Sequence, residues 1–229
     1  PQALAAGYYN LGAFWKTTSG SSGSGSATYT LWAWGSRTFG QLGDGIADAI
    51  PCQISGSWSS IAGTNMSSLG IRSDGTLWGW GENYNSQLGP NAPSGTFTNS
   101  SPIQVGGSWS QVFGGGVQTY GIRPDGTLWA WGSNLYGQLG LGVTSGALYS
   151  SPVQIGGSWA QVTGGGSNND TTGIRTDGTL WSWGYNAYGE LGLGNTVDRS
   201  SPVQVGAATN WSKVAAGAYS RFAIKTDGT

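Results

Sequence analysis

The chain has 229 residues, with nine basic and ten acidic side chains and a formal net charge of −1. Such sparse charge, with no basic tail or stripe, argues against nucleic-acid binding, and no apolar run is long enough to cross a bilayer. The sequence has no His and a single cysteine, Cys52, so neither an internal disulfide nor a cysteine-based zinc site is available. We therefore predict a chain that is not an enzyme, with no catalytic residue, cofactor, bound metal or membrane insertion.

A repeat of about fifty residues runs through the sequence, and its signature is Leu-Trp-x-Trp-Gly. The signature begins at Leu31, Leu77, Leu128 and Leu180. A fifth unit ends at Thr229, where the next Leu-Trp strand is due. The predicted units span residues 1–56, 57–107, 108–157 and 158–209, followed by a partial unit at 210–229, within one propeller domain or fragment over 1–229.

The first unit is degenerate, because a polar loop over residues 18–27 replaces its Asp-Gly turn. Each later unit reads as four short strands, and in the third unit we predict them at 109–113, 119–123, 128–132 and 152–155. Asp125-Gly126 predicts a type I′ hairpin between the second and third strands. The glycines at 114–116 predict a bend or a close approach of two backbones.

Alternation along the third strand places Trp129 and Trp131 on one face and Leu128 and Ala130 on the other. We expect both faces to pack against neighbouring sheets, because a single four-stranded sheet cannot bury both faces alone. Repeated units of this kind predict an all-β fold, a β-propeller of four-stranded antiparallel blades with four full repeats and a partial fifth.

The stretch from Asp125 to Gly140, Asp-Gly-Thr-Leu-Trp-x-Trp-Gly-x-Asn-x-x-Gly-Gln-Leu-Gly, resembles the regulator of chromosome condensation repeat family. The resemblance implies a propeller, which has seven blades in the founding members of the family and would need more repeats than this sequence contains. Part of a seven-bladed ring is the favoured interpretation, and a ring completed by another chain or a smaller ring are the alternatives. Eukaryotic members include a nucleotide-exchange factor for a small GTPase that docks on chromatin. The family's usual His at the start of the second strand is absent here, so we do not expect exchange activity or chromatin binding. Its place is taken by Ser67, Gln118, Asp170 and Ser220.

The Trp-rich, weakly charged repeats resemble the bacterial and phage-type versions of the family, which are often parts of large surface or virion structural proteins. The resemblance thus favours a non-enzymatic structural or protein-interaction module, extracellular or on a virion or cell surface. Two alternatives stay open. One is a carbohydrate-binding, lectin-like propeller, and the other is a guanine nucleotide exchange factor-like regulator of a small GTPase. The expected partners are another protein or a surface glycan, with other chains of a larger assembly as a further possibility.

Two sets of residues recur at fixed positions in the repeat and are candidate contacts. The first set consists of cations that a propeller would place on one rim. They could bind an anion or a partner, but local pairing with the Asp of each hairpin is the favoured interpretation. These cations are Lys16, Arg72, Arg123, Arg175 and Lys225.

The second set consists of aromatic residues in the loop after the third strand, beside Asn and Gln side chains. They could stack on sugar rings or anchor a protein partner, whereas packing between blades is the structural alternative. These aromatic residues are Phe39, Tyr84, Tyr136, Tyr185 and Tyr188.

Overall fold

The computed structural model describes residues 4–6, 10–17, 28–35, 38–43, 52–95, 99–165, 169–217 and 219–229. All regular structure in these residues is β-strand, and none of them forms a helix that could span a membrane. The first sheet contains, in order, β1 (Leu4–Ala6), β2 (Asn10–Thr17), β3 (Thr28–Gly35) and β4 (Cys52–Ile54). The second contains β5 (Trp58–Gly63), β6 (Ser67–Arg72), β7 (Leu77–Gly81) and β8 (Asn99–Gln104).

The third and fourth repeats share one long strand. They contain β9 (Gln111–Gly114), β10 (Gln118–Ile122), β11 (Thr127–Ser133), β12 (Leu148–Gly164), β13 (Asp170–Arg175), β14 (Leu180–Gly184) and β15 (Arg199–Gln204). The first half of β12 pairs with β11 and its second half with β13, so β12 is the last strand of one repeat and the first of the next. The partial fifth repeat contributes β16 (Trp211–Ala216) and β17 (Arg221–Lys225). The all-β, four-strand repeat predicted from the sequence is therefore confirmed.

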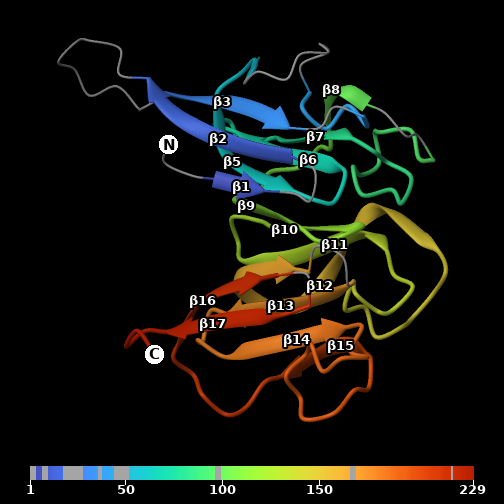
Figure 1. Ribbon diagram of the computed structural model, residues 1–229, viewed down its shortest axis with the longest axis vertical. Coiled ribbons are helices and arrows are strands. Elements are labelled where there is room, and N and C mark those ends of the chain that lie inside the picture. Colours follow the sequence, from blue (N-terminus) through green and yellow to red (C-terminus); the bar gives the residue numbers. More distant parts are fainter. Residues whose placement is uncertain are drawn as a thin grey trace.

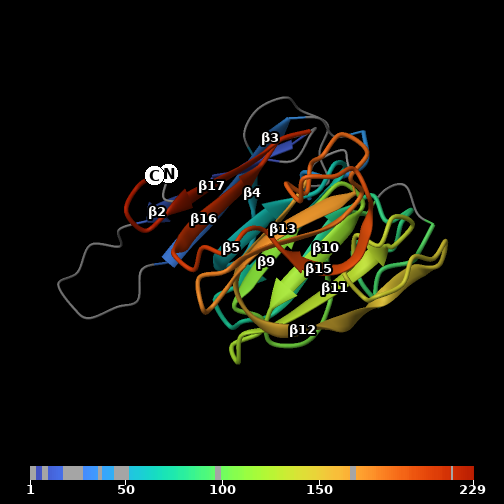
Figure 2. The ribbon, with the colours of Figure 1, turned by 90° about the horizontal axis from the view of Figure 1, so that it is seen from below.

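The sheets stack face to face, and successive blades follow one another down Figure 1, from β7 through β10 and β11 to β14 and β15 at the bottom. The first strands of neighbouring repeats contact one another, β5 with β9 and β12 with β16, so they lie along a common side of the stack. Figure 2, which shows the molecule from below, has the strands of successive sheets crossing it in the same general direction. This arrangement is that of consecutive propeller blades.

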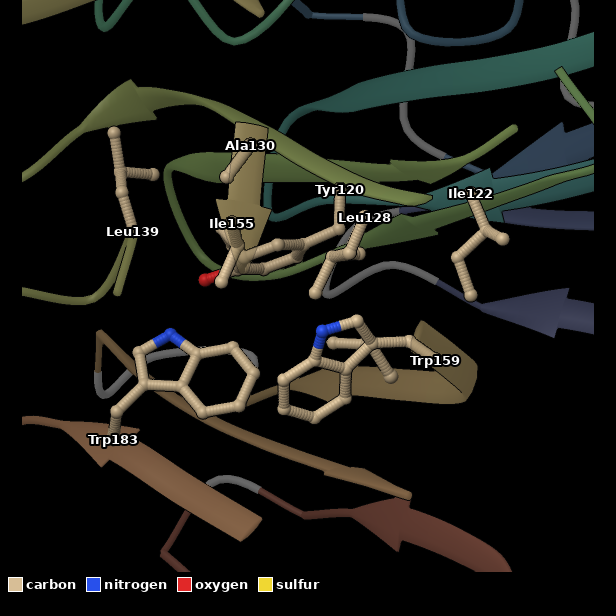
Figure 3. Packing of buried hydrophobic residues seen from close by; sticks show 9 residues of the cluster. Tyr120, Ile122, Leu128, Ala130, Leu139, Ile155, Trp159 and Trp183 are labelled. Atoms are coloured by element: carbon tan, nitrogen blue, oxygen red, sulfur yellow. The ribbon is translucent and has the colours of Figure 1, made fainter. Parts of the chain in front are cut away.

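Each interface between blades is filled by tryptophans from one blade and aliphatic residues from the preceding one. Between the third and fourth blades, Trp159 and Trp183 face Tyr120, Leu128 and Ile155 (Figure 3). Both indoles are fully buried, and their ring centroids are 5.3 Å apart in an edge-to-face arrangement.

Both faces of β11 are used, as predicted. Leu128 and Ala130 belong to the cluster that contains Trp183. Trp131 packs on the opposite side, against Leu69 and Ile71 of the second blade. A blade therefore buries one face against each neighbour.

A repeated hydrogen-bond pattern ties each blade to the next. The backbone carbonyl of Gln41, Gln87 or Gln138 accepts the indole N–H of a tryptophan in the following blade, at N···O distances of 2.9, 2.9 and 2.8 Å. The same carbonyl accepts a hydroxyl from the second strand of that blade. The tryptophans are Trp80, Trp131 and Trp183, and the hydroxyl donors are Ser68, Thr119 and Thr171. The buried indole N–H groups of Trp80, Trp131 and Trp183 are thus satisfied, which makes a fully buried Trp tolerable at this position.

The glycines that end the first strands are required by close packing of backbones. A Cβ added to Gly114 would collide with the carbonyl oxygen of Gly63 in the preceding blade. A Cβ added to Gly164 would lie 2.6 Å from the Cα of Gly115. The predicted close approach is confirmed, and it lets neighbouring first strands converge.

The predicted type I′ hairpin is wrong. Gly126 has a φ of 81°, but Asp125 is not among the described non-glycine residues with positive φ, and type I′ needs both. Instead Gly126 N–H bonds to Arg123 O and Arg123 N–H to Thr127 O, which is a type I turn followed by a glycine bulge. The cause is the Asp125 carboxylate, which accepts the Thr127 N–H at 2.9 Å and the Thr127 hydroxyl at 2.7 Å.

Candidate functional site: the loop edge of the blades

The stack has two edges with different chemistry. The hairpins between the second and third strands form one, which we call the hairpin edge (residues 73–76, 124–127, 176–179 and 226–229). The loops from the third strand to the fourth form the other, together with residues 219 and 220 between β16 and β17. We call this the loop edge (residues 38–43, 82–95, 134–147, 185–198 and 219–220). The loops after β7 and β11 lie at the right of Figure 1, whereas the C-terminus lies at the left.

A buried asparagine fixes three loops of the loop edge internally, those that follow β7, β11 and β14. The Oδ1 atoms of Asn83, Asn134 and Asn186 accept the N–H of a leucine five residues later, at 2.8, 3.1 and 3.0 Å. Their Nδ2 groups donate to carbonyls across the loop. Since all three asparagines are fully buried, these loops are braced from within and present a defined surface.

A second buried polar residue holds the aromatic position of each loop. The side-chain oxygens of Gln41, Gln138 and Glu190 accept the backbone N–H of Phe39, Tyr136 and Tyr188 at 2.8, 2.8 and 2.9 Å. The equivalent residue of the second blade is Asn85, held in the same way by Gln87. The motif Gln-Leu-Gly thus works locally, by orienting the residue two positions before it.

Four tyrosines from three successive repeats form a continuous row on this edge, which we call the tyrosine row: Tyr136, Tyr185, Tyr188 and Tyr219. Successive ring centroids are 5.1, 6.5 and 5.9 Å apart, and each pair meets edge to face. Tyr188 is 74% exposed and Tyr219 is 62% exposed, while the other two are half-buried. The row is therefore an ordered aromatic surface open to solvent.

A buried ion pair involves the strand that follows Tyr219, because Arg221 lies two residues after this tyrosine. Asp170, at the start of β13, is buried and forms an ion pair with Arg221, at the start of β17. Burial raises the pKa of Asp170 to about 6, against the opposing effect of Arg221. Loss of solvent contact raises the pKa of Tyr185, and nearby Tyr188, Glu190 and Asp198 raise it further. The tyrosine row thus adjoins carboxylates.

Three of the five candidate aromatic residues lie in the tyrosine row, and the other two lie outside it. Tyr136, Tyr185 and Tyr188 come together in the tyrosine row. Phe39 is half-buried at the equivalent position of the first blade, and Tyr84 lies exposed in the second blade, outside the row.

Sequence reasoning missed Tyr219 as a member of this surface. Its signal was available, since Tyr219 precedes the second strand at the same end of the blade as the loops after the third strand.

The candidate rim cations lie at the hairpin edge, where they stack on tryptophans. The guanidinium carbons of Arg72, Arg123 and Arg175 lie 3.9, 4.0 and 3.7 Å from the ring centroids of Trp78, Trp129 and Trp181. Lys225 lies 5.4 Å from the Trp211 ring, and the side chain of Lys16 is outside the described residues.

The favoured interpretation, ion pairing with the hairpin Asp, is not what the described residues show. The guanidinium groups lie over indole rings, and the carboxylate of each hairpin Asp bonds to a Thr two residues later. These Thr contacts lower the pKa of Asp74, Asp125 and Asp177 more than the nearby Arg does. The physical reason is geometric, because the Asp carboxylate caps its own turn while the guanidinium is taken up by the rings.

Within the described residues, no group of three or more His, Cys, Asp or Glu side chains is placed to hold a metal ion. Cys52 is in no disulfide and donates its Sγ–H to the Ala33 carbonyl at 3.2 Å.

Two stretches, residues 125–169 and 177–224, match the family model of the regulator of chromosome condensation (RCC1) repeat. The chain belongs to the RCC1 repeat family. Its RCC1 repeats are 30% identical over 180 residues to the ultraviolet-B receptor UVR8 of Arabidopsis thaliana, an alignment covering 73% of this chain and 40% of the relative. They are 29% identical over 175 residues to the mitochondrial RCC1 domain-containing protein RUG3 of the same plant, covering 71% of this chain and 39% of RUG3.

Solved structures show the same fold. The crystal structure of Kap60 bound to yeast RCC1 (Prp20) matches with a TM-score of 0.79 at 16% identity, over 95% of this chain and 52% of that chain. Prp20p from Saccharomyces cerevisiae, crystallised in work on its binding to Gsp1p and histones, matches with a TM-score of 0.77 at 17% identity, over 96% and 54%. The chain therefore spans about half the length of the RCC1 structures that it matches.

Proposed function

We propose that this RCC1-repeat chain is a non-enzymatic interaction module that binds another protein through its loop edge. The observation that carries the proposal is the tyrosine row, in which three of the four aromatic side chains lie on braced loops and two of the four are mostly exposed to solvent. Aromatic residues on a rigid scaffold are the usual anchors of protein interfaces, because they bury a large area with little loss of side-chain entropy.

The internal repeats show that the fold does not require these tyrosines. The position of Tyr185 is occupied by Glu82 in the second blade and Ser133 in the third, and that of Tyr219 by Met66 and Val117. The blades fold with polar or aliphatic residues there, so packing alone does not account for the row. Exposed aromatic groups that the scaffold does not need are typical of a binding surface.

Two structures of one yeast relative support a protein partner rather than a small molecule. Prp20p, which is yeast RCC1, was studied for its binding to Gsp1p and histones and was crystallised bound to Kap60. These partners belong to that protein. For the present chain, they favour a partner that is itself a protein.

A photo-crosslinking experiment compares the two edges. A benzophenone amino acid replaces Leu135, an exposed residue of the loop edge, or in a matched variant Pro124, an exposed residue of the hairpin edge. We expect the first variant to form a covalent adduct with a defined protein that rebinds the purified chain, and the second to form none. Adducts from the hairpin edge only, or from both edges equally, would contradict the proposal.

Carbohydrate binding is the second candidate, since the exposed Tyr188 lies in a loop that also carries the exposed polar side chains of Asn195 and Asp198. It predicts saturable binding to a neutral oligosaccharide on a glycan array. A role as regulator of a small GTPase predicts accelerated nucleotide release in a direct assay, and it is the weaker alternative. The expected position on a virion or cell surface stays a prediction, which immunogold labelling of intact particles or cells would test.

A further inference from the structure

The tyrosine row combines two chemistries that together select a particular kind of ligand. It offers aromatic rings, whose faces carry partial negative charge, and it lies beside carboxylates. Glu190 Oε2 accepts the backbone N–H of Tyr188 at 2.9 Å. Asp198 Oδ1 accepts the backbone N–H of Asn186, the residue after Tyr185, at 2.8 Å. A positively charged side chain is favoured by both features at once.

The distribution of charge between the two edges strengthens this point. At the hairpin edge the cations Arg72, Arg123, Arg175 and Lys225 are matched by one Asp in each turn. Among the described residues of the loop edge and the strand ends beside it, the acidic groups outnumber the basic ones. The acidic residues are Glu82, Asp170, Glu190 and Asp198, and the basic ones are Arg199 and Arg221.

One of these two cations, Arg221, is already paired with a carboxylate of the same chain. Arg221 forms its ion pair with Asp170, which leaves Arg199 at the start of β15 as the other cation of this edge in the described part of the chain. The surplus of negative charge in the described residues is thus at the loop edge, where the tyrosines are.

The same molecule shows the contact that a cationic ligand would make. At the hairpin edge, guanidinium groups lie over indole rings at 3.7 to 4.0 Å. Within the described residues, no Lys or Arg lies over any ring of the tyrosine row. The row therefore has aromatic groups of the kind that this chain pairs with cations elsewhere, but without a cation of its own.

Resting on the proposed protein-binding function, we propose that the tyrosine row, with Glu190 and Asp198, binds an arginine- or lysine-bearing segment of the partner protein. An extended chain rises about 3.3 Å per residue, so a segment of roughly five residues reaches from Tyr136 to Tyr219 at most. Tyr188 and Tyr219, the most exposed members, are the expected main contacts. Asp198, which is exposed in the same loop as Tyr188, supplies long-range attraction.

The test uses the complete chain and a labelled peptide in which Arg alternates with Gly and Ser, with binding followed by fluorescence anisotropy. Matched peptides carry Lys, Glu or the neutral arginine isostere citrulline in place of Arg. We expect binding to the Arg peptide, weaker binding to the Lys peptide, and little to the Glu and citrulline peptides. Added salt weakens the binding, because part of the attraction is between exposed charges.

Variants of the chain locate the site. We expect Tyr188→Ser combined with Tyr219→Ser to weaken binding at least about tenfold, and Asp198→Asn to weaken it about threefold. Tyr84→Ser is the matched control, an exposed tyrosine of the loop edge outside the row, and it leaves binding unchanged. Tyr188→Phe keeps the ring and so keeps most of the binding, whereas a contact made through the hydroxyl would be lost. Unchanged thermal midpoints show that every variant is folded.

The proposal is overturned by equal binding of the Arg and citrulline peptides, by no binding of the Arg peptide, or by binding that the double variant retains. Binding of a neutral oligosaccharide that requires Tyr188 and Tyr219 also overturns it, in favour of a glycan. These outcomes differ from failure of the proposed function. A loop-edge adduct at position 135 with a partner whose contact segment lacks basic residues removes only this inference, while absence of that adduct removes the proposed function.

Discussion

Removing the indole of Trp183 tests how much one interface between blades contributes to stability. Trp183 is fully buried between the third and fourth blades, and its Nε1–H donates to the Gln138 carbonyl at 2.8 Å. A buried Trp removes roughly 200 Å² from water, and replacing such a residue with Ala costs about 3–5 kcal/mol in unfolding free energy. With a urea slope of about 1–3 kcal/mol per molar, we expect Trp183→Ala to lower the unfolding midpoint by about 1–5 M.

Trp181 is the matched control, because it lies on the same strand but is only half-buried and stacks on Arg175. We expect Trp181→Ala to cost about 1–2 kcal/mol, since less of its surface is removed from water. Trp183→Phe retains most of the buried area and should also cost about 1–2 kcal/mol. Urea unfolding followed by far-ultraviolet circular dichroism measures all three. Equal costs at positions 181 and 183 would refute the face-to-face packing of these blades.

Three further changes test other contacts. Gly173→Ala should cost about 1–3 kcal/mol in urea unfolding, because its Cβ would lie 2.9 Å from the buried Trp159 ring; an unchanged midpoint would contradict this packing. Burial raises the pKa of Asp170 to about 6 from 3.8, so the folded chain binds a proton more tightly than the unfolded chain between these values. The unfolding free energy should therefore fall, on the order of 1–3 kcal/mol, as the pH rises from about 4 to about 6, and Asp170→Asn should flatten that slope in pH-dependent urea titrations. Arg175→Ala should cost about 0.5–2 kcal/mol and alter the intrinsic fluorescence, because its guanidinium covers the Trp181 ring; an unchanged spectrum would argue against the stacking.

The strand pattern was predictable because burial repeats with the sequence. The alternation in Leu-Trp-x-Trp-Gly assigned Trp131 and Leu128 to opposite faces, and the structure packs each against a different blade. The close approach of backbones at the ends of the first strands was also predictable from their glycines, because only a residue without a Cβ fits where two backbones meet.

Contacts between distant residues were not predictable in this way. The stacking of Arg175 on Trp181 depends on strand register and side-chain rotamers, and the charge pattern alone favoured pairing with Asp177. The hairpin type failed for a related reason, since the Asp–Gly dipeptide does not reveal that the Asp side chain caps the following Thr.

Part of the tyrosine row could be predicted from the sequence. Tyr136 and Tyr188 share one position of the repeat and could be grouped from their spacing. Tyr219 belongs to a different loop of the next blade and joins the row only because the blades stack. A binding surface formed across repeats therefore requires the packing between them.

Hydroxyl-radical footprinting of the chain, with and without the partner recovered at the loop edge, tests most directly whether the loop edge is the functional surface. We predict that Tyr188 and Tyr219 lose reactivity in the complex while residues of the hairpin edge, such as Pro124, keep theirs. Unchanged reactivity at both tyrosines, with protection at the hairpin edge instead, would contradict the assignment of the loop edge as the functional surface.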